Sequence, residues 1–217
     1  MKEPVIAVFD IGKTNKKLLL FDTSLNLVNE YEEKFPVTTD EEGFECDDIE
    51  LIESWVKNSI IELVQSNKFN PLAVNFATYG ATLAYIDSHG KRLTPIYNYL
   101  KPLDESIPEA LYKKYGGKNE FCRCTASPAL GMLNSGIQAL WLKKKKPEVF
   151  SKTRYILHFP QYFLFLFTGR TVSEHTSIGC HTAMWNFDKM TYHRWIKDEN
   201  IKVPDPVPVT TMYETVI

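Results

Sequence analysis

Cysteine is scarce in this chain, which has four among its 217 residues. They are Cys46, Cys122, Cys124 and Cys180. They show neither C-x-x-C spacing nor a paired framework, which excludes a small secreted domain stapled by disulfides. A metal site that combines the last three with His181 is disfavoured, because ligands one residue apart are poor zinc spacing. Residues 1–4 lead into a strand and not into a signal peptide, so we expect a cytoplasmic protein.

Long hydrophobic runs are missing too. The most apolar window, residues 162–167, is far shorter than the ~20 residues that span a bilayer, so we expect a buried helix there. The 25 basic and 27 acidic residues nearly balance, which excludes binding to nucleic acid or to an anionic membrane driven by net charge. The lysines at 143–146 suit the C-terminal end of a helix. Hydrophobic residues make up 44% of the chain, enough for a packed core in one large domain or two small ones.

Two well-known phosphate-binding signatures are absent. The pattern G-x-G-x-x-G does not occur. Gly12-Lys13-Thr14 matches the end of a P-loop, but Ala7 stands where its first glycine should be. A helix should follow a P-loop, whereas residues 18–21 are typical of a strand. The chain therefore lacks a P-loop.

What the chain does contain is a polar loop between two apolar runs, residues 5–9 and 18–21. This pattern predicts a strand, a tight loop and a second strand. Asp10 follows the first strand, and Gly12 lets the backbone approach a ligand closely. An acidic residue with neighbouring backbone N–H groups suits a nucleotide phosphate and its Mg²⁺, held by Asp10 directly or through water. A surface hairpin with a polar tip is the alternative.

The following segments predict an α/β fold. Residues 27–35 complete a meander of three strands, and residues 38–47 are polar and acidic. Asp47, with Glu50 three residues later, opens a helix whose apolar residues recur at intervals of three and four up to Val64. Residues 72–78 read as a buried strand, and residues 82–87 as another after a turn at Gly80.

The loop Asp-x-Gly-x-Thr-Asn-x-Lys between two strands resembles the first phosphate motif of the FGGY carbohydrate kinases, which belong to the actin-like ATPase superfamily. Lys13 stands where the family usually has Thr or Ala. Residues 125–142 are similar to the family's Thr-Gly loop and its helix ending Leu-x-Trp-Leu, which makes Trp141 a core residue. The resemblance implies a ribonuclease H-like α/β domain, with a mixed sheet and helices on both faces.

The resemblance also implies site residues around ATP and Mg²⁺. Asp10 would be the catalytic acidic residue of this loop and the metal ligand. The phosphates would be bound by Gly12, Lys13, Thr14, Asn15 and Lys17. Neither His175 nor His181 is given a role, because a lone histidine is more often structural than catalytic.

A second corner, at residues 78–81, resembles the sugar-contacting corner of the family. Its Thr-aromatic-Gly sequence is similar to the rhamnulokinase and fuculokinase branches, which implies a larger, less polar sugar such as a 6-deoxy ketohexose. The implied substrate is a ketose of the L-rhamnulose, L-fuculose or xylulose type. The sugar would be bound by Thr78, Tyr79, Gly80 and Ala81, with Asn98 and Lys101 as further polar contacts. An ordinary hairpin with Tyr79 in the core is the alternative.

The resemblance implies that residues 1–217 are the N-terminal, sugar-binding domain of an ATP-dependent kinase that phosphorylates a ketose at a primary hydroxyl. The general-base aspartate and the nucleotide-binding domain would lie beyond residue 217, so the chain alone should turn over little or nothing. The expected binding partner is a small-molecule sugar substrate, and the sequence leaves open whether the protein forms a homodimer. A sugar-binding or regulatory module without catalysis, and another actin-like ATPase, are the competing interpretations.

Overall fold

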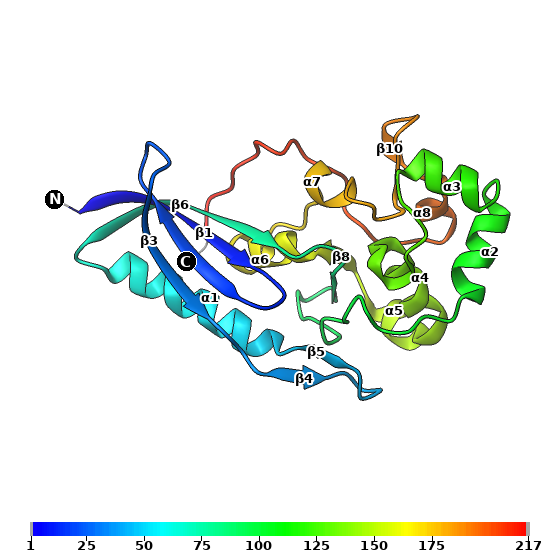
Figure 1. Ribbon diagram of the computed structural model, residues 1–217, viewed down its shortest axis with the longest axis horizontal. Coiled ribbons are helices and arrows are strands. Elements are labelled where there is room, and N and C mark those ends of the chain that lie inside the picture. The colour runs from blue at the N-terminus through cyan, green and yellow to red at the C-terminus, as the bar shows by residue number, and fades with distance from the viewer. Residues whose placement is uncertain (1, 216–217) are drawn as a thin grey trace.

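The computed structural model describes residues 2–215, and it is built around a four-stranded mixed sheet (Figure 1). Its strands are β1 (Glu3–Ile11), β2 (Lys16–Phe21), β3 (Leu27–Glu33) and β6 (Phe69–Thr78), in the order β3-β2-β1-β6. The first three form the predicted antiparallel meander, and β6 pairs parallel to β1. A parallel neighbour needs a crossover, and helix α1 (Ile49–Gln65) provides it. The predicted mixed α/β sheet is confirmed.

Aromatic side chains from two helices cover one face of this sheet. The ring of Phe9 lies 5.3 Å from that of Trp55 on α1 and 5.6 Å from that of Phe76 on β6. Phe76 in turn stacks on Phe163 and Phe167 of helix α6 (Phe159–Thr168), at 5.6 and 5.7 Å. Since Phe9 and Phe76 are paired neighbours, α1 and α6 cover the same face. Helices were expected on both faces, but along residues 3–11 the side chains of the opposite face are only half-buried or exposed.

The acidic segment before α1 forms a hairpin that the sequence did not predict. Strands β4 (Val37–Thr39) and β5 (Glu45–Asp47) pair antiparallel, three residues each. The helix begins one residue later than expected, because Asp48 and not Asp47 is its N-cap: the Asp48 carboxylate accepts a hydrogen bond from Leu51 N at 3.2 Å. The side chain of Asp47 is therefore free for another role.

The other half of the molecule has its own hydrophobic core around helix α4 (Ser135–Lys145). Trp141 is 4% exposed and its ring lies 4.9 Å from that of Tyr97, so its prediction as a core residue is confirmed. Strands β7 (Leu83–Ile86) and β8 (Tyr155–His158) pair beside this core. The other elements are α2 (Ser106–Lys114), α3 (Lys118–Thr125), η1 (Gly131–Leu133), α5 (Pro147–Lys152), α7 (His175–Ile178), β9 (Trp185–Asn186), β10 (Thr191–Tyr192) and α8 (Arg194–Asp198).

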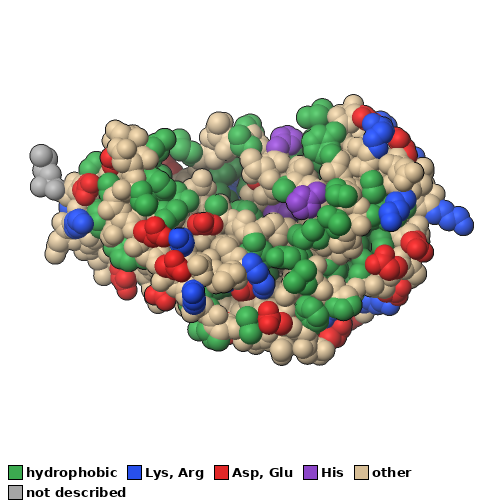
Figure 2. All heavy atoms as spheres, in the orientation of Figure 1, with side chains coloured by type: hydrophobic (Ala, Val, Ile, Leu, Met, Phe, Trp, Pro, Cys, Tyr) green, Lys and Arg blue, Asp and Glu red, His purple; other side chains and the backbone are tan. Residues whose placement is uncertain are grey.

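The surface carries both signs of charge. On the face shown in Figure 2, acidic and basic side chains are interspersed among polar and apolar ones. The apolar window at residues 162–167 is part of α6, which is ten residues long. Within residues 2–215, no helix has both the length and the apolar composition needed to cross a membrane.

Candidate active site: a phosphate loop beside a polar cavity

The predicted phosphate loop is the tight connection between β1 and β2. A Cβ atom at Gly12 would lie 2.9 Å from the backbone oxygen of Asn15, closer than real Cβ contacts allow, so this turn needs glycine. Asp10 is exposed at the end of β1, and its register partner on β2 is Lys17. Paired residues of neighbouring strands lie on the same face, so this carboxylate and this ammonium are neighbours on the open face of the sheet. Thr14 is exposed at the tip of the loop.

The Lys17 ammonium is shared with β3. It lies 2.5 Å from Glu30 Oε1 and 3.6 Å from Glu32 Oε2. The hydrogen bond to Glu30, helped by its charge, raises the pKa of Lys17, which stays cationic at neutral pH. Its side chain is one third exposed, so an anion at the loop can reach it.

The second predicted corner lies directly beside this loop. The backbone N–H of Tyr79 donates to the carbonyl of Ile11, the last residue of β1, at 3.0 Å. Ala81 has a positive φ of 58°, which turns the chain out of β6. A Cβ atom at Gly80 would meet nothing within 4 Å, so this residue faces open space. The structure thus brings the predicted phosphate loop and the predicted sugar corner together.

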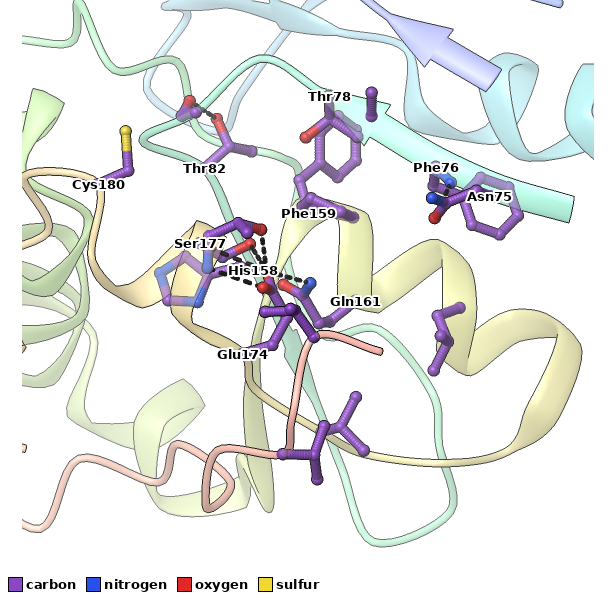
Figure 3. Close-up of a pocket in the computed structure, with 18 of the residues that line it drawn as sticks. Asn75, Phe76, Thr78, Thr82, His158, Phe159, Gln161, Glu174, Ser177 and Cys180 are labelled. Carbon is purple, nitrogen blue, oxygen red and sulfur yellow. Dashed lines mark hydrogen bonds between the residues drawn. The ribbon is translucent and has the colours of Figure 1, made fainter. Parts of the chain in front are cut away.

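A cavity of about 490 Å³ opens at this corner (Figure 3). One wall is the end of β6 and the corner, including Thr78, Tyr79, Gly80, Ala81 and Thr82. The start of α6 and the segment around α7 supply much of the remaining lining. The apolar part of this lining comes from Phe159, Leu164 and Val172, and the polar part from Gln161, Glu174, Thr176 and Ser177. Small-molecule sites typically have volumes of ~300–1,000 Å³, so this cavity is the right size for a monosaccharide.

The polar wall is organised by Glu174. Its carboxylate accepts hydrogen bonds from the backbone N–H groups of Thr176 at 2.7 Å and Ser177 at 2.9 Å, and from Gln161 Nε2 at 3.1 Å. Burial raises the pKa of Glu174, but these hydrogen bonds outweigh it and the net shift is downward. Figure 3 shows Gln161, Glu174 and Ser177 pointing toward one another. The sequence alone did not indicate this wall.

His158 also lines the cavity, and its ring is almost completely buried. Its Nε2 lies 3.1 Å from the hydroxyl oxygen of Ser135. Burial lowers the pKa of His158 to about 4, so the imidazole is neutral at physiological pH. His158 was not predicted, since a single histidine at the end of a strand carries no sequence signal of its own.

Asp47 is the most heavily hydrogen-bonded acidic side chain near the loop. Its carboxylate lies 2.7 Å from Lys13 Nζ, 2.9 Å from Lys16 Nζ and 2.7 Å from the hydroxyl of Tyr79. Burial alone would raise the pKa of Asp47, but the hydrogen bonds that it accepts outweigh burial and lower the pKa. The sequence interpretation of Asp47 as a helix cap missed this role, because Asp48 takes the cap.

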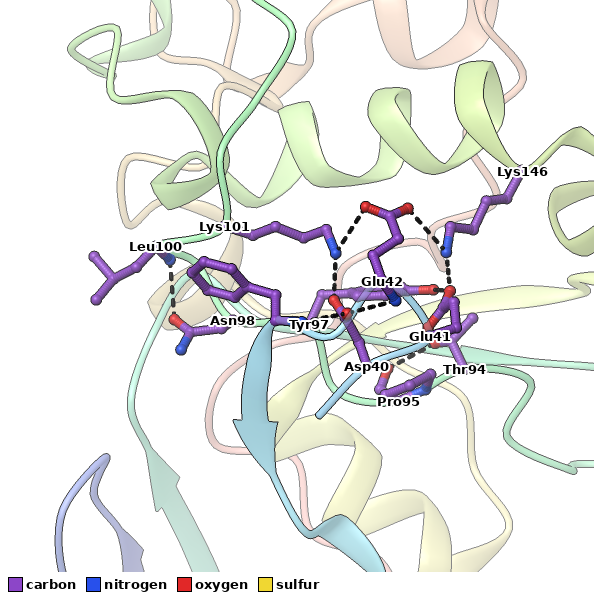
Figure 4. Close-up of polar contacts among 11 residues, drawn as sticks. Asp40, Glu41, Glu42, Thr94, Pro95, Tyr97, Asn98, Leu100, Lys101 and Lys146 are labelled. Carbon is purple, nitrogen blue, oxygen red and sulfur yellow. Dashed lines mark hydrogen bonds and ion pairs between the residues drawn. The ribbon is translucent and has the colours of Figure 1, made fainter. Parts of the chain in front are cut away.

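Asn98 and Lys101 are not among the residues that line the cavity. Asn98 Oδ1 accepts from the backbone N–H of Leu100 at 2.9 Å. The Lys101 ammonium forms a buried ion pair with Asp40 and lies 3.0 Å from Glu42 Oε2, in the hairpin between β4 and β5 (Figure 4). These two residues, which were grouped with the corner, therefore lie outside the lining of this cavity.

Asp10 is the candidate metal ligand of the site. No cluster of three or more His, Cys, Asp or Glu in residues 2–215 could hold a metal ion by itself. A Mg²⁺ ion needs fewer protein ligands than such a cluster, because it is commonly bound by one or two carboxylates together with substrate phosphates and waters. An exposed carboxylate beside a glycine turn fits that requirement.

Solved structures share this fold, with its mixed sheet and covering helices. The chain is similar to a xylulose kinase and a gluconate kinase from Lactobacillus acidophilus, both with a TM-score of 0.83 and 23% identity. The two alignments cover 98% and 99% of this chain, and 44% of each of those chains. A Plasmodium falciparum glycerol kinase solved with ADP has a TM-score of 0.75 and 18% identity. That alignment covers 94% of this chain and 43% of the glycerol kinase chain.

Residues 5–200 match the FGGY family of carbohydrate kinases, N-terminal domain, and the chain belongs to this family. Curated relatives include the rhamnulokinases of Halalkalibacterium halodurans, 24% identical over 188 residues, and of Oceanobacillus iheyensis, 24% identical over 149. These alignments cover 87% and 66% of this chain, but only 37% and 31% of the relatives. The predicted family is confirmed, and an actin-like ATPase of another kind is not supported.

Proposed function

We propose that this chain is the N-terminal, sugar-binding domain of an ATP-dependent kinase that phosphorylates a ketose at a primary hydroxyl. The observation that carries this proposal is the contact between Tyr79 N and Ile11 O, which joins the sugar corner to the phosphate loop. Phosphoryl transfer depends mainly on positioning and charge neutralisation, so a kinase needs its acceptor and its phosphates side by side. The general base and the nucleotide-binding domain would be supplied by chain beyond residue 217.

The cavity favours a ketose of the rhamnulose or fuculose type. Phe159, Leu164 and Val172 offer an apolar surface to the methyl group of a 6-deoxy sugar. Thr82, Thr176 and Ser177 offer hydroxyl groups to its ring or chain hydroxyls. The open space at Gly80 leaves room for six carbons, and the likeness to rhamnulokinases supports the same class. Xylulose is the smaller alternative.

The loop would bind the phosphates of ATP. Gly12, Thr14 and Asn15 would present backbone N–H and side-chain groups, and Lys13 and Lys17 would supply positive charge. Mg²⁺ held by Asp10 would neutralise charge on the phosphates. Residues 1–217 alone would bind the sugar and turn over little, because they span only 37% of the length of a rhamnulokinase relative and phosphoryl transfer needs both sides of the cleft. A cytoplasmic location and a homodimer stay predictions from the sequence.

Calorimetry with L-rhamnulose, L-fuculose, D-xylulose and glycerol tests this proposal. We expect one 6-deoxy ketose to bind and Gly80→Arg to abolish binding, because the new side chain enters the cavity. Leu72→Arg is the matched control, since it adds the same side chain to an exposed position of β6 outside the cavity. No binding to any sugar by the folded protein, or equal loss in both variants, would contradict the assigned site.

A further inference from the structure

Asp47 joins two segments that belong to different halves of the proposed active site. Its side chain, at the end of β5, is 6% exposed. One carboxylate oxygen, Oδ2, accepts hydrogen bonds from Lys13 Nζ and from the Tyr79 hydroxyl, each at 2.7 Å. The other, Oδ1, lies 2.9 Å from Lys16 Nζ. A single buried carboxylate thus holds a residue of the phosphate loop and a residue of the sugar corner.

Lys13 is the more exposed of the two lysines that pair with Asp47. Its side chain is 26% exposed, whereas that of Lys16 is 2% exposed. Lys16 also donates to the backbone carbonyl of Lys13 at 3.0 Å, which fixes the loop at this residue. The Lys13 ammonium lies 5.6 Å from the centre of the Tyr79 ring, close enough for a cation–π contact. An anion at the loop can therefore reach Lys13 while Lys16 stays with Asp47.

Tyr79 connects Asp47 to the cavity. It lines the cavity, and its ring packs against that of Phe159, another lining residue, with the ring centres 5.2 Å apart. Only its hydroxyl group bonds to Asp47. A change in the charge around Asp47 therefore acts directly on a side chain that shapes the sugar site.

We propose that Asp47 is a positioning residue that couples occupancy of the phosphate loop to occupancy of the sugar cavity, through Lys13 on one side and Tyr79 on the other. When a phosphate group pairs with the Lys13 ammonium, less of the negative charge on Asp47 is neutralised. Asp47 then accepts the hydrogen bond from the Tyr79 hydroxyl more strongly. That holds the Tyr79 ring in the cavity wall. Coupling between sites is reciprocal, so a bound ketose must raise anion affinity by the same factor. This inference rests on the proposed sugar-binding function.

The test uses two ligands on the 217-residue chain. Tripolyphosphate is the probe of the loop, and the ketose found by the sugar panel is the probe of the cavity. The measured quantity is the ratio of tripolyphosphate dissociation constants without and with saturating ketose. We expect about a fivefold ratio or more in the unmodified chain, which is the usual range for coupled sites.

Three variants separate positioning from structure. Asp47→Asn cannot pair with two lysines, so it should strengthen tripolyphosphate binding without ketose by releasing Lys13, while the ratio falls to about one. Tyr79→Phe removes only the hydroxyl and should lower the ratio without weakening tripolyphosphate binding. Asp48→Asn makes the same charge change one residue away and keeps a good helix cap, so it should retain the full ratio.

The outcomes distinguish the two proposals. A folded chain that binds no ketose contradicts the proposed function and the coupling with it. Ketose binding with a ratio of one in the unmodified chain, or an unchanged ratio in Asp47→Asn, overturns the coupling alone. If Asp47→Asn does not fold, Tyr79→Phe decides the question, because removing one hydroxyl leaves the ion pairs of Asp47 intact.

Discussion

The imidazole of His158 shares a hydrogen bond of 3.1 Å with the hydroxyl of Ser135, and both side chains are buried. This contact joins the end of β8 to the first residue of α4. The ring has no charged partner at hydrogen-bond distance within residues 2–215, so protonation would place in the interior a charge that Glu174 offsets only in part.

His158 should therefore make the protein sensitive to mild acid. Its pKa is about 4 in the folded chain and ~6.5 in an unfolded one, so the unfolded state takes up the proton first as the pH falls. Stability should drop through this window, by about 2 kcal/mol between pH 7 and pH 5. The free energy of unfolding of His158→Gln, measured by urea titration at both pH values, should lack this component. His89→Gln, at an exposed turn, should behave like the unmodified chain, and an equal slope in all three would contradict the assignment.

Lys101→Met should destabilise the fold without weakening sugar binding. Lys101 and Asp40 are 4% and 1% exposed, and removing one partner of a buried pair costs about 3 kcal/mol or more. Lys145→Met is the control, because the pair of Lys145 with Asp104 is about half exposed. This change should lower the free energy of unfolding by less than about 1 kcal/mol. Urea titration gives stability and calorimetry gives ketose affinity. A large loss of ketose affinity in folded Lys101→Met would instead restore Lys101 to the sugar site.

Gly12→Ala should disturb the phosphate loop. The added methyl would meet the Asn15 backbone oxygen at 2.9 Å, so the turn must open, at a cost of about 1–3 kcal/mol. Tripolyphosphate affinity should fall with it. Gly80→Ala serves as the comparison, since its methyl meets nothing within 4 Å and should leave stability unchanged. Normal anion binding by Gly12→Ala would show that the loop does not depend on this close turn.

Gly136→Ala tests packing against helix propensity. Alanine in place of glycine normally stabilises a helix by about 1 kcal/mol. Here the methyl would lie 2.7 Å from the Thr182 backbone oxygen and 2.9 Å from Trp195 Cζ2. We expect the overpacking to dominate, with a net loss of about 1–2 kcal/mol in the free energy of unfolding. A gain in the melting temperature would show that α4 can move away from these neighbours.

Much of the sheet could be predicted from the sequence because its signals are local. The alternation in β1 and β2, and the spacing of apolar residues in α1, reflect one buried face in each element. The β4–β5 hairpin could not be predicted this way. Its strands have three residues each, β4 is exposed throughout, and its tip is held by Lys101 and Lys146 from distant segments (Figure 4).

The candidate site divides in the same way. The loop at Gly12 and the corner at Gly80 were visible as turn residues after apolar strands. That they lie side by side depends on the parallel register that pairs Ile11 with Thr78, which no local pattern encodes. The role of Asp47 was hidden, because it and Asp48 are equally good caps and only the three-dimensional structure shows which one is used.

The aromatic stack from Phe9 through Phe76 to Phe163 has a consequence for biosynthesis. The ribosome makes β1, α1 and β6 long before α6, so Phe76 lacks its partners Phe163 and Phe167 until about residue 168 has left the exit tunnel. Contacts over such sequence distances are slow to form. We expect the nascent chain to need shielding by chaperones during this interval, and slower translation before α6 to increase its aggregation.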